Sequence, residues 1–239
     1  MRSWIGVVVS IGALGALWGC GAPEGSAPST PAAEPAREAP EAEAPANPLL
    51  DPAGAQETAP DTFRARFETT KGEFTVEVVR EWAPRGADRF YNLVKLGFYD
   101  DVALFRIVEG FVAQFGINGD PAVSRAWSDA RIPDDPVGQS NTRGMVTYAK
   151  TNAPHSRTTQ LFINYGDNAN LDALGFAPFG RVVEGMEVVD SFFSGYGESV
   201  DQGLAERRGN EYFRGERPDL DFIERATLEV PEAAAAAGD

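Results

Sequence analysis

An arginine and a glutamine separated by a possible turn are the residues whose types most readily support chemistry. Arg106 lies between Phe105 and Ile107, so in an extended strand its side chain points away from both. Gly110 can turn the chain before Gln114. A guanidinium is planar and always charged, and it can donate hydrogen bonds to a carbonyl oxygen or a developing lone pair. Taken alone, the segment favours a solvated arginine on a strand surface.

Two later parts of the sequence change this interpretation of Arg106. They are Thr158-Thr159-Gln160-Leu161-Phe162-Ile163-Asn164, and Asn170-Leu171-Asp172 followed by Phe176-Ala177-Pro178-Phe179-Gly180. In this order and at these intervals the segments resemble cyclophilin-type peptidyl-prolyl isomerases, from about Phe67 to Val189. Residues 190–228 resemble the longer ending of some bacterial members. The resemblance implies an enzyme that accelerates cis/trans exchange of X-Pro bonds in proline-containing polypeptides.

The resemblance also implies a role for each matching residue. Arg106 corresponds to the catalytic arginine of the family and Gln114 to the glutamine beside it. Ala149 and Lys150 correspond to an Ala-Asn pair whose backbone holds the substrate. The other matching positions are expected to bind the substrate or line the proline pocket: Phe111, Val112, Gln160, Phe162, Leu171 and Phe176.

Three positions depart from the pattern of eukaryotic members. Val112 replaces a methionine, which keeps the pocket apolar but makes it narrower. Asn170 stands in place of a tryptophan that would grip cyclosporin, and Phe176 stands where a histidine is usual. We therefore expect weak cyclosporin binding with the isomerase activity retained.

Other kinds of chemistry are not favoured by the sequence. His155, the sole histidine, lies in a polar loop and is expected to be a surface residue. The acids Asp134-Asp135 lie in a turn bounded by prolines and are expected to be solvated. Residues 116–120 resemble a turn rather than a phosphate-binding loop. We expect no metal and no cofactor.

The N-terminus has the order of residues found in a signal peptide. Residues 1–19 begin with one basic residue and continue as an uncharged, largely apolar run. Leu17-Trp18-Gly19-Cys20 resembles the bacterial lipobox, in which the cysteine receives a diacylglycerol. Gly21 and Ala22 follow, and the absence of aspartate there resembles lipoproteins sent to the outer membrane. We expect lipidation at Cys20 and a position in the bacterial cell envelope, on the outer membrane facing the periplasm; an uncleaved anchor is the alternative.

The remaining chain divides by composition into a tether, one domain and a tail. Residues 20–61 are rich in Pro, Ala and Glu, cannot bury enough apolar surface to fold, and are expected to be a disordered tether. Residues 62–230 make one domain, and residues 231–239 an Ala-rich frayed tail. The net charge of −15 argues against nucleic acid as a partner. We expect a monomer tethered to a membrane through its lipid.

Within the domain, short apolar runs bounded by turn residues predict a mainly β fold. Residues 63–67 and 74–79 alternate as in a hairpin. One helical pattern begins at Pro84 and stops at Gly97, a second continues from Met186 to Tyr196, and residues 197–220 are expected to include another short helix. These elements fit a closed, eight-stranded antiparallel cyclophilin-like barrel capped by two main helices, with an open sandwich as the alternative. The remaining strands are expected at Leu104–Val108, Phe111–Ile117, Met145–Ala149, Leu161–Asn164, Phe179–Val183 and Phe222–Leu228.

Two further functions compete with the enzyme. A tethered peptide-binding module or chaperone would use the same pocket with little turnover, and would tolerate substitution of Arg106. A structural envelope lipoprotein would need neither Arg106 nor Gln114. The presence of both residues favours catalysis.

Overall fold

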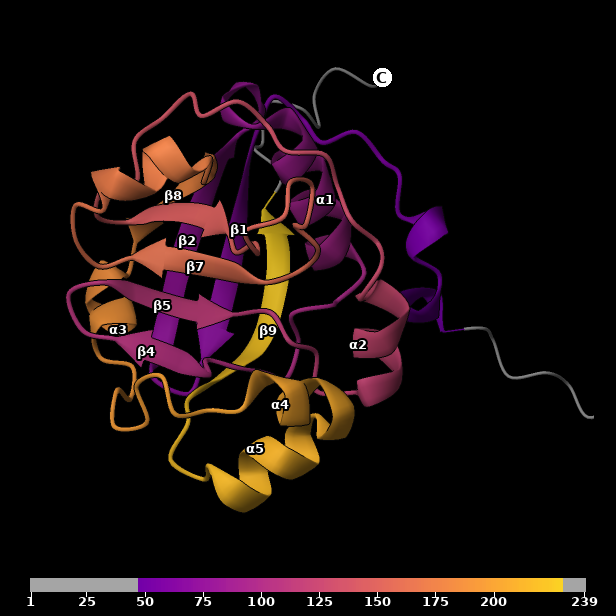
Figure 1. Ribbon diagram of the computed structural model, residues 1–239, viewed down its shortest axis with the longest axis vertical. Helices are drawn as coiled ribbons and strands as arrows, with labels where there is room; N and C mark the ends of the chain where they lie inside the picture. Colours follow the sequence, from indigo (N-terminus) through magenta and orange to yellow (C-terminus); the bar gives the residue numbers. More distant parts are fainter. Residues whose placement is uncertain (1–46, 230–239) are drawn as a thin grey trace, which may run out of the picture. The chain divides into compact units, whose positions relative to one another are not determined.

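The computed structural model describes residues 47–229, in which helices pack around one curled antiparallel sheet. In Figure 1 the strands β1, β2 and β9 run behind β4, β5, β7 and β8, so two parts of the sheet face each other. The strands are β1 Thr62–Thr69, β2 Gly72–Val79, β3 Val102–Ala103, β4 Arg106–Val108, β5 Val112–Phe115, β6 Met145–Tyr148, β7 Leu161–Asn164, β8 Pro178–Glu184 and β9 Phe222–Glu229.

The strands are hydrogen-bonded in the order β3-β9-β1-β2-β8-β6-β7-β5-β4. The mainly β, antiparallel character predicted from the sequence is confirmed, but the sheet has nine strands rather than eight. The ninth is β3, whose two residues pair with β9 and are too few to show an alternating pattern. Within residues 47–229 no strand pairing joins β3 to β4, so the sheet keeps two edges.

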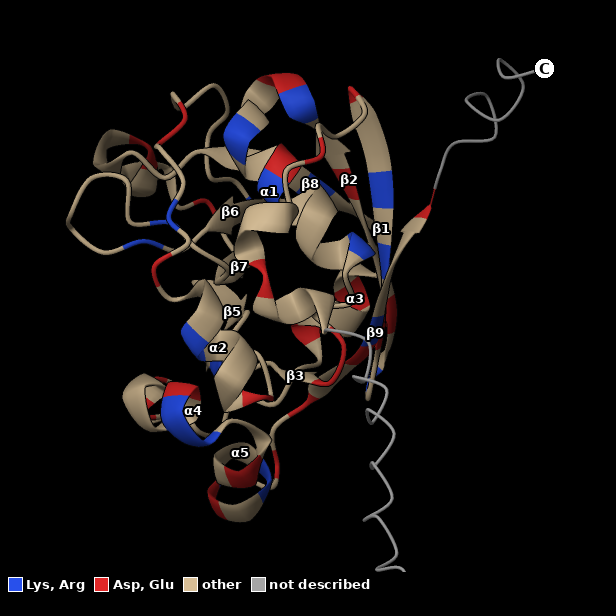
Figure 2. Ribbon diagram, turned by 90° about the vertical axis from the view of Figure 1, so that its right-hand side faces the viewer, with Lys and Arg blue, Asp and Glu red and all other residues tan. Residues whose placement is uncertain are grey.

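The predicted hairpin forms the most regular part of the sheet. β1 and β2 pair from Thr62↔Val79 to Thr69↔Gly72, and Phe67 lies opposite Phe74 with ring centroids 4.8 Å apart. On the outer face Arg64 forms an ion pair with Glu77, so basic positions of β1 lie beside acidic positions of β2 (Figure 2). The alternation therefore places one face in the core and leaves a charged face outside.

Helix α1 has the predicted bounds and covers one side of the core. It begins at Pro84, where the missing N–H costs nothing, and ends before Gly97, whose φ of 73° lies in the left-handed region that favours glycine. A second helix, α2, was not predicted. Asp120 accepts a hydrogen bond from the backbone N–H of Ala122 and thus caps it. The ranges are α1 Pro84–Lys95 and α2 Pro121–Trp127.

The second predicted helix is shorter than expected. The sequence pattern predicts that it continues to Tyr196, whereas α3 ends at Asp190. Past this point the backbone N–H of Phe193 donates to Asp221 at 2.8 Å, and Gly197 has a positive φ of 51°. Two short helices follow instead of the one expected. The ranges are α3 Met186–Asp190, α4 Gln202–Arg208 and α5 Asn210–Glu216.

Residues 47–61 pack on the domain, although the sequence predicts that they belong to the disordered tether. They include two short 3-10 helices, η1 Pro48–Leu50 and η2 Pro52–Gly54. The indole N–H of Trp127 donates to the carbonyl of Leu49 at 2.8 Å, and Asp88 accepts from the backbone N–H of Ala59 at 2.9 Å. Ala55 and Ala59 of this segment are buried against the main core, and neither such small side chains nor the polar contacts produce a hydrophobic pattern in the sequence. The other residues of the tether, the leader, Cys20 and residues 230–239 lie outside the described part.

The described residues contain three apolar clusters. The main core fills the space between the two parts of the sheet and α1, and is rich in aromatic rings such as Phe67, Phe90 and Phe115. A second cluster joins α4 and α5 to Phe105, next to Arg106. A third, small cluster consists of Val112, Phe162 and Leu171. No helix within residues 47–229 is long and apolar enough to cross a membrane.

Candidate active site

The register of three adjacent strands places the predicted polar residues on one face of the sheet. Arg106 of β4 lies directly opposite Gln114 of β5, and Gln114 lies opposite Phe162 of β7. Residues directly opposite in antiparallel strands point to the same side. The alternate residues Ile107 and Ala113 point the other way, into the main core. The core therefore fixes the strands that carry the candidate site.

A chain of hydrogen bonds connects the three polar side chains. Nη1 of Arg106 donates to Oε1 of Gln114 at 3.0 Å, and Nε2 of Gln114 donates to Oε1 of Gln160 at 2.9 Å. The guanidinium also lies 5.7 Å from the ring centroid of Phe111. Among the described residues Arg106 has one further side-chain hydrogen-bond partner, Glu198, to which no motif in the sequence points. The arginine is thus held in a defined orientation rather than left free in solvent.

Apolar side chains form a pocket beside the guanidinium. Val112, Phe162 and Leu171 are buried. The ring of Phe176 packs edge-on against the ring of Phe162, with 5.8 Å between the two ring centroids. The cavity measures about 230 Å³. Nine of the ten domain residues predicted for the site line it: Arg106, Phe111, Val112, Gln114, Ala149, Lys150, Phe162, Leu171 and Phe176. An apolar cavity with a few fixed polar groups at its rim is typical of a ligand site.

The tenth residue, Gln160, faces a second and larger cavity. This cavity measures about 450 Å³ and shares Gln114, Ala149 and Lys150 with the first. The backbone N–H of Ala149 donates to the carbonyl of Gln160 at 2.9 Å, which joins the ends of β6 and β7 between the two cavities. Because they share these three lining residues, the two cavities adjoin, and together they are called the groove below.

Lys150 and Phe176 occupy the boundary of this groove. The ammonium group of Lys150 lies 5.2 Å from the ring centroid of Phe176, a geometry that favours attraction between a cation and an aromatic face. Asn170 is exposed on the 3-10 helix η4 (Ala169–Leu174) and directly precedes Leu171, which lines the smaller cavity. Positions 150 and 170 therefore carry a cation and an amide, where the family resemblance implies an amide and an indole.

The wall that carries Leu171 is fixed by the next residue. Asp172 accepts hydrogen bonds from the Ser140 hydroxyl at 2.5 Å and from the backbone and side-chain N–H groups of Asn141 at 2.9 and 2.7 Å. Partial burial would raise the pKa of this carboxyl, but the hydrogen bonds outweigh it and hold the pKa below the ordinary 3.8. Asp172 is therefore ionised at neutral pH and anchors η4.

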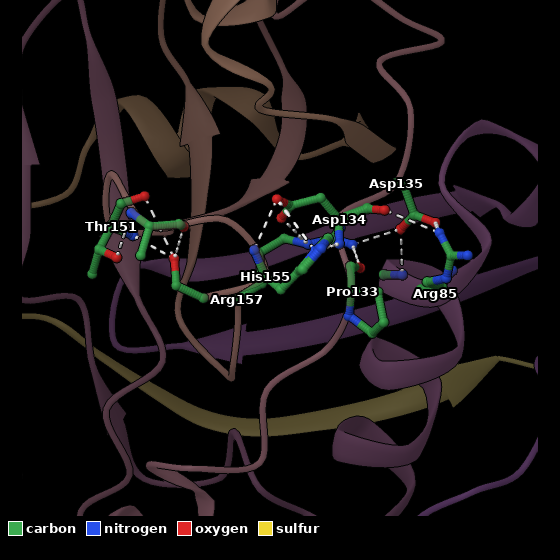
Figure 3. A network of polar contacts seen from close by, with 10 residues as sticks. Arg85, Pro133, Asp134, Asp135, Thr151, His155 and Arg157 are labelled. Carbon is green, nitrogen blue, oxygen red and sulfur yellow. Dashed lines mark hydrogen bonds and ion pairs between the residues drawn. The ribbon is translucent and has the colours of Figure 1, made fainter.

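A polar network supports the loop beside the larger cavity (Figure 3). The carboxylate of Asp135 is fully buried and accepts from Arg157 at 3.0 Å and from the backbone of Gly86 at 2.9 Å. The expectation that both Asp134 and Asp135 are solvated is therefore wrong for Asp135. Asp135 can be buried in its proline-bounded turn because the distant Arg157 and the N-terminus of α1 supply hydrogen-bond donors to its carboxylate.

His155 lies on the surface, as predicted. Its Nδ1 accepts a hydrogen bond from the backbone N–H of Asp134 at 2.9 Å, and its side chain is 63% exposed. It belongs to the network of Figure 3 and does not line either cavity of the groove. In residues 47–229 no group of three or more histidine, cysteine, aspartate or glutamate side chains is arranged to hold a metal ion.

Comparison with known proteins agrees with this geometry. The family model described as "Cyclophilin type peptidyl-prolyl cis-trans isomerase/CLD" matches residues 64–206. The chain is 33% identical over 132 residues to peptidyl-prolyl cis-trans isomerase B of Escherichia coli, covering 52% of this chain and 80% of that protein. It is 35% identical over 127 residues to a peptidyl-prolyl cis-trans isomerase of Acinetobacter baylyi, covering 52% and 68%. The chain belongs to the cyclophilin-type peptidyl-prolyl cis-trans isomerases.

Solved structures of cyclophilins share the fold. A cyclophilin-type isomerase of Cryptosporidium parvum has a TM-score of 0.55 at 18% identity, covering 71% of this chain and 99% of that one. A second structure of this Cryptosporidium parvum isomerase, determined in the presence of the dipeptide Ala-Pro, has a TM-score of 0.52 at 18% identity, covering 70% of this chain and 99% of that one. At such identity the likeness concerns the fold alone. The activity rests on the sequence relatives and the family model: the chain is a peptidyl-prolyl cis-trans isomerase.

Proposed function

We propose that Arg106 is the catalytic residue of this isomerase and that the cavity beside it binds the proline ring. The observation that carries the proposal is the fixed guanidinium, bound through Nη1 to Gln114 at 3.0 Å, at the rim of an apolar cavity of about 230 Å³. The Ala-Pro dipeptide named for the related cyclophilin structure has the chemistry that such a cavity accepts.

The reaction requires rotation about one amide bond and breaks none. Resonance holds the X-Pro bond planar, with a barrier of about 20 kcal/mol. In the twisted transition state the prolyl nitrogen becomes pyramidal and its lone pair can accept a hydrogen bond. A guanidinium can donate to this nitrogen or to the prolyl carbonyl without a proton transfer. Phe111, Val112, Phe162, Leu171 and Phe176 would hold the ring while the preceding residue rotates.

The test of this role is substitution of Arg106. Arg106→Ala should lower kcat/KM in a protease-coupled assay with an X-Pro tetrapeptide by about 100-fold, with a smaller change in KM, since the donor acts in the transition state. Val112 and Gln160 remain in place to bind the peptide. A variant that retains kcat/KM would instead favour a peptide-binding module with little turnover.

We also propose that the enzyme is a lipoprotein acting on exported or envelope proteins. The support is the sequence Leu17-Trp18-Gly19-Cys20 after an apolar leader, and Gly21-Ala22 after the cysteine. A lipid at Cys20 would hold the monomeric domain at the outer membrane facing the periplasm. Mass spectrometry of the N-terminal peptide should detect a lipidated cysteine, and Cys20→Ala should release the protein from membranes. An unmodified Cys20 in a protein with an intact leader would contradict the proposal.

A further inference from the structure

A carboxylate outside the recognisable motifs contacts the guanidinium of Arg106. Oε1 of Glu198 accepts a hydrogen bond from Nε of Arg106 at 3.1 Å, and Nη2 of Arg106 contacts the same oxygen. Nη1 is bound to Gln114 on the other side. Of the five N–H donors of the guanidinium, these contacts engage three and leave one on each terminal nitrogen. The arginine is therefore held along one edge and keeps donors for a substrate.

Glu198 is presented by a segment anchored at both ends. Ser194 donates to Oε1 of Glu109, in the turn between β4 and β5, at 2.7 Å. Tyr196 donates through its hydroxyl to Asp219 at 2.8 Å. Val200 is buried in the second cluster, which also contains Phe105, the neighbour of Arg106 in the chain. In Figure 1 this segment leads from α3 toward α4 along the side of β4. Its position is thus tied to the same strand that carries the arginine.

We propose that Glu198 is a positioning residue for catalysis, which acts by fixing the orientation of Arg106. This inference rests on the catalytic role proposed for the arginine. Gln114 alone would leave the guanidinium free to turn about the single contact at Nη1, whereas a second contact along the Nε–Nη2 edge fixes its plane. Orientation of this kind lowers the barrier because the donor need not be ordered during the reaction.

The contact is expected to affect catalysis more than stability. The side chain of Glu198 is 68% exposed and that of Arg106 is 21% exposed. Ion pairs this open to solvent contribute little to folding because water and salt screen them. Removal of Glu198 should therefore leave the unfolding temperature close to that of the wild type. A loss of activity without a loss of stability would identify its role as positioning.

The experiment compares Glu198→Ala and Glu198→Gln with a control, Glu187→Ala, an exposed acid of α3. Glu198→Ala should lower kcat/KM on an X-Pro tetrapeptide by about 10-fold, mainly through kcat. Glu198→Gln, which keeps an oxygen acceptor, should lie between Glu198→Ala and the wild type, and Glu187→Ala should match the wild type. An unchanged or increased kcat/KM in Glu198→Ala would overturn the proposal, since the carboxylate would then be a bystander or a competitor of the substrate.

A second arm separates this inference from the role of Arg106. In an Arg106→Ala background, Glu198→Ala should cause no further loss, because a positioning residue has nothing left to position. An equal further loss would overturn the proposal by showing that Glu198 acts independently of the arginine. If Arg106→Ala alone kept the wild-type kcat/KM, the proposed role of Arg106 would fail instead, and that result is visible before Glu198 is changed.

Discussion

Gln114 stands between Arg106 and Gln160 and has a different contact with each: its Oε1 accepts from the guanidinium at 3.0 Å, and its Nε2 donates to Gln160 at 2.9 Å. The donor bond fixes which way the amide faces, so its oxygen is directed at the arginine. Gln114 is also 8% exposed, which shields this contact from water.

Gln114→Ala should therefore lower kcat/KM by about 10-fold, because Arg106 loses one of its fixed contacts. Gln160→Ala should have a smaller effect on kcat, since Gln114 itself remains beside the arginine. Steady-state kinetics on one X-Pro peptide would check both. A larger loss in kcat for Gln160→Ala than for Gln114→Ala would contradict this order of dependence.

Lys150 should influence which residue is accepted next to proline. Its ammonium lines both cavities of the groove, and it packs on Phe176. We expect Lys150→Asn to reduce the ratio of kcat/KM for a Glu-Pro peptide to that for a Lys-Pro peptide by up to about fivefold. This factor corresponds to the free energy that solvent-accessible ion pairs contribute. The preference should also weaken as salt is raised. Equal ratios of kcat/KM for Glu-Pro and Lys-Pro peptides in both proteins would show that the cation does not contact the substrate.

Asn170 should limit binding of cyclosporin. Asn170→Trp would add an indole next to Leu171, which lines the groove, and large aromatic side chains often dominate binding energies. We expect weak inhibition of the wild type and inhibition that is about 10-fold tighter in the variant. The measurement is the inhibition constant of cyclosporin in a protease-coupled assay. The kcat/KM of each protein without inhibitor is measured alongside, to show that both proteins are active. Nanomolar inhibition of the wild type would refute the expectation.

Asp172 should make the pocket wall sensitive to acid. Its pKa is lowered in the folded protein, so its stabilising effect is complete above the unfolded value of 3.8 and is lost as the pH falls from there through the folded pKa. Asp172→Asn should lower the free energy of unfolding at pH 7 by about 1 kcal/mol and reduce the loss of stability on acidification. Urea unfolding at pH 7 and pH 3 tests this. A variant whose stability falls as steeply as that of the wild type would exclude Asp172 as a cause.

Residues 47–61 should contribute to the stability of the domain. A chain that starts at residue 62 loses the hydrogen bond from Trp127 to the Leu49 carbonyl and the packing of Ala55 and Ala59 against the core. A hydrogen bond contributes about 0.5–1.5 kcal/mol and burial of apolar surface adds to it, so we expect a clearly lower unfolding temperature. A chain that starts at residue 47 is the matched control. Equal unfolding temperatures for the two would mean that the segment only rests on the surface.

The sequence correctly predicts those strands and helices whose limits are set by local patterns. Alternation defines β1 and β2, and Pro84 and Gly97 mark the limits of α1, because these signals act within a few residues. The family resemblance implies that Gln114 lies beside Arg106, and the register of β4 and β5 on either side of their short turn brings the two residues opposite each other.

The features missed by sequence analysis depend on distant partners. Asp135 is buried because Arg157 and the start of α1 reach it, and Glu198 meets Arg106 across 92 positions of the chain. Polar contacts of this kind have no periodicity, and one sequence contains no sign of them. The same holds for residues 47–61, whose composition is typical of disorder although tertiary hydrogen bonds fix them.

The position of Arg106 on the last strand of the sheet has a consequence for an enzyme whose family binds proline-containing peptides. Within residues 47–229, β4 has three residues and no neighbour beyond it in the strand order, so its free edge could template the addition of a foreign strand. Short edge strands that carry a charge resist such addition. We therefore expect Arg106, with its carboxylate partner beside it, to discourage a bound peptide from pairing with this edge of the sheet.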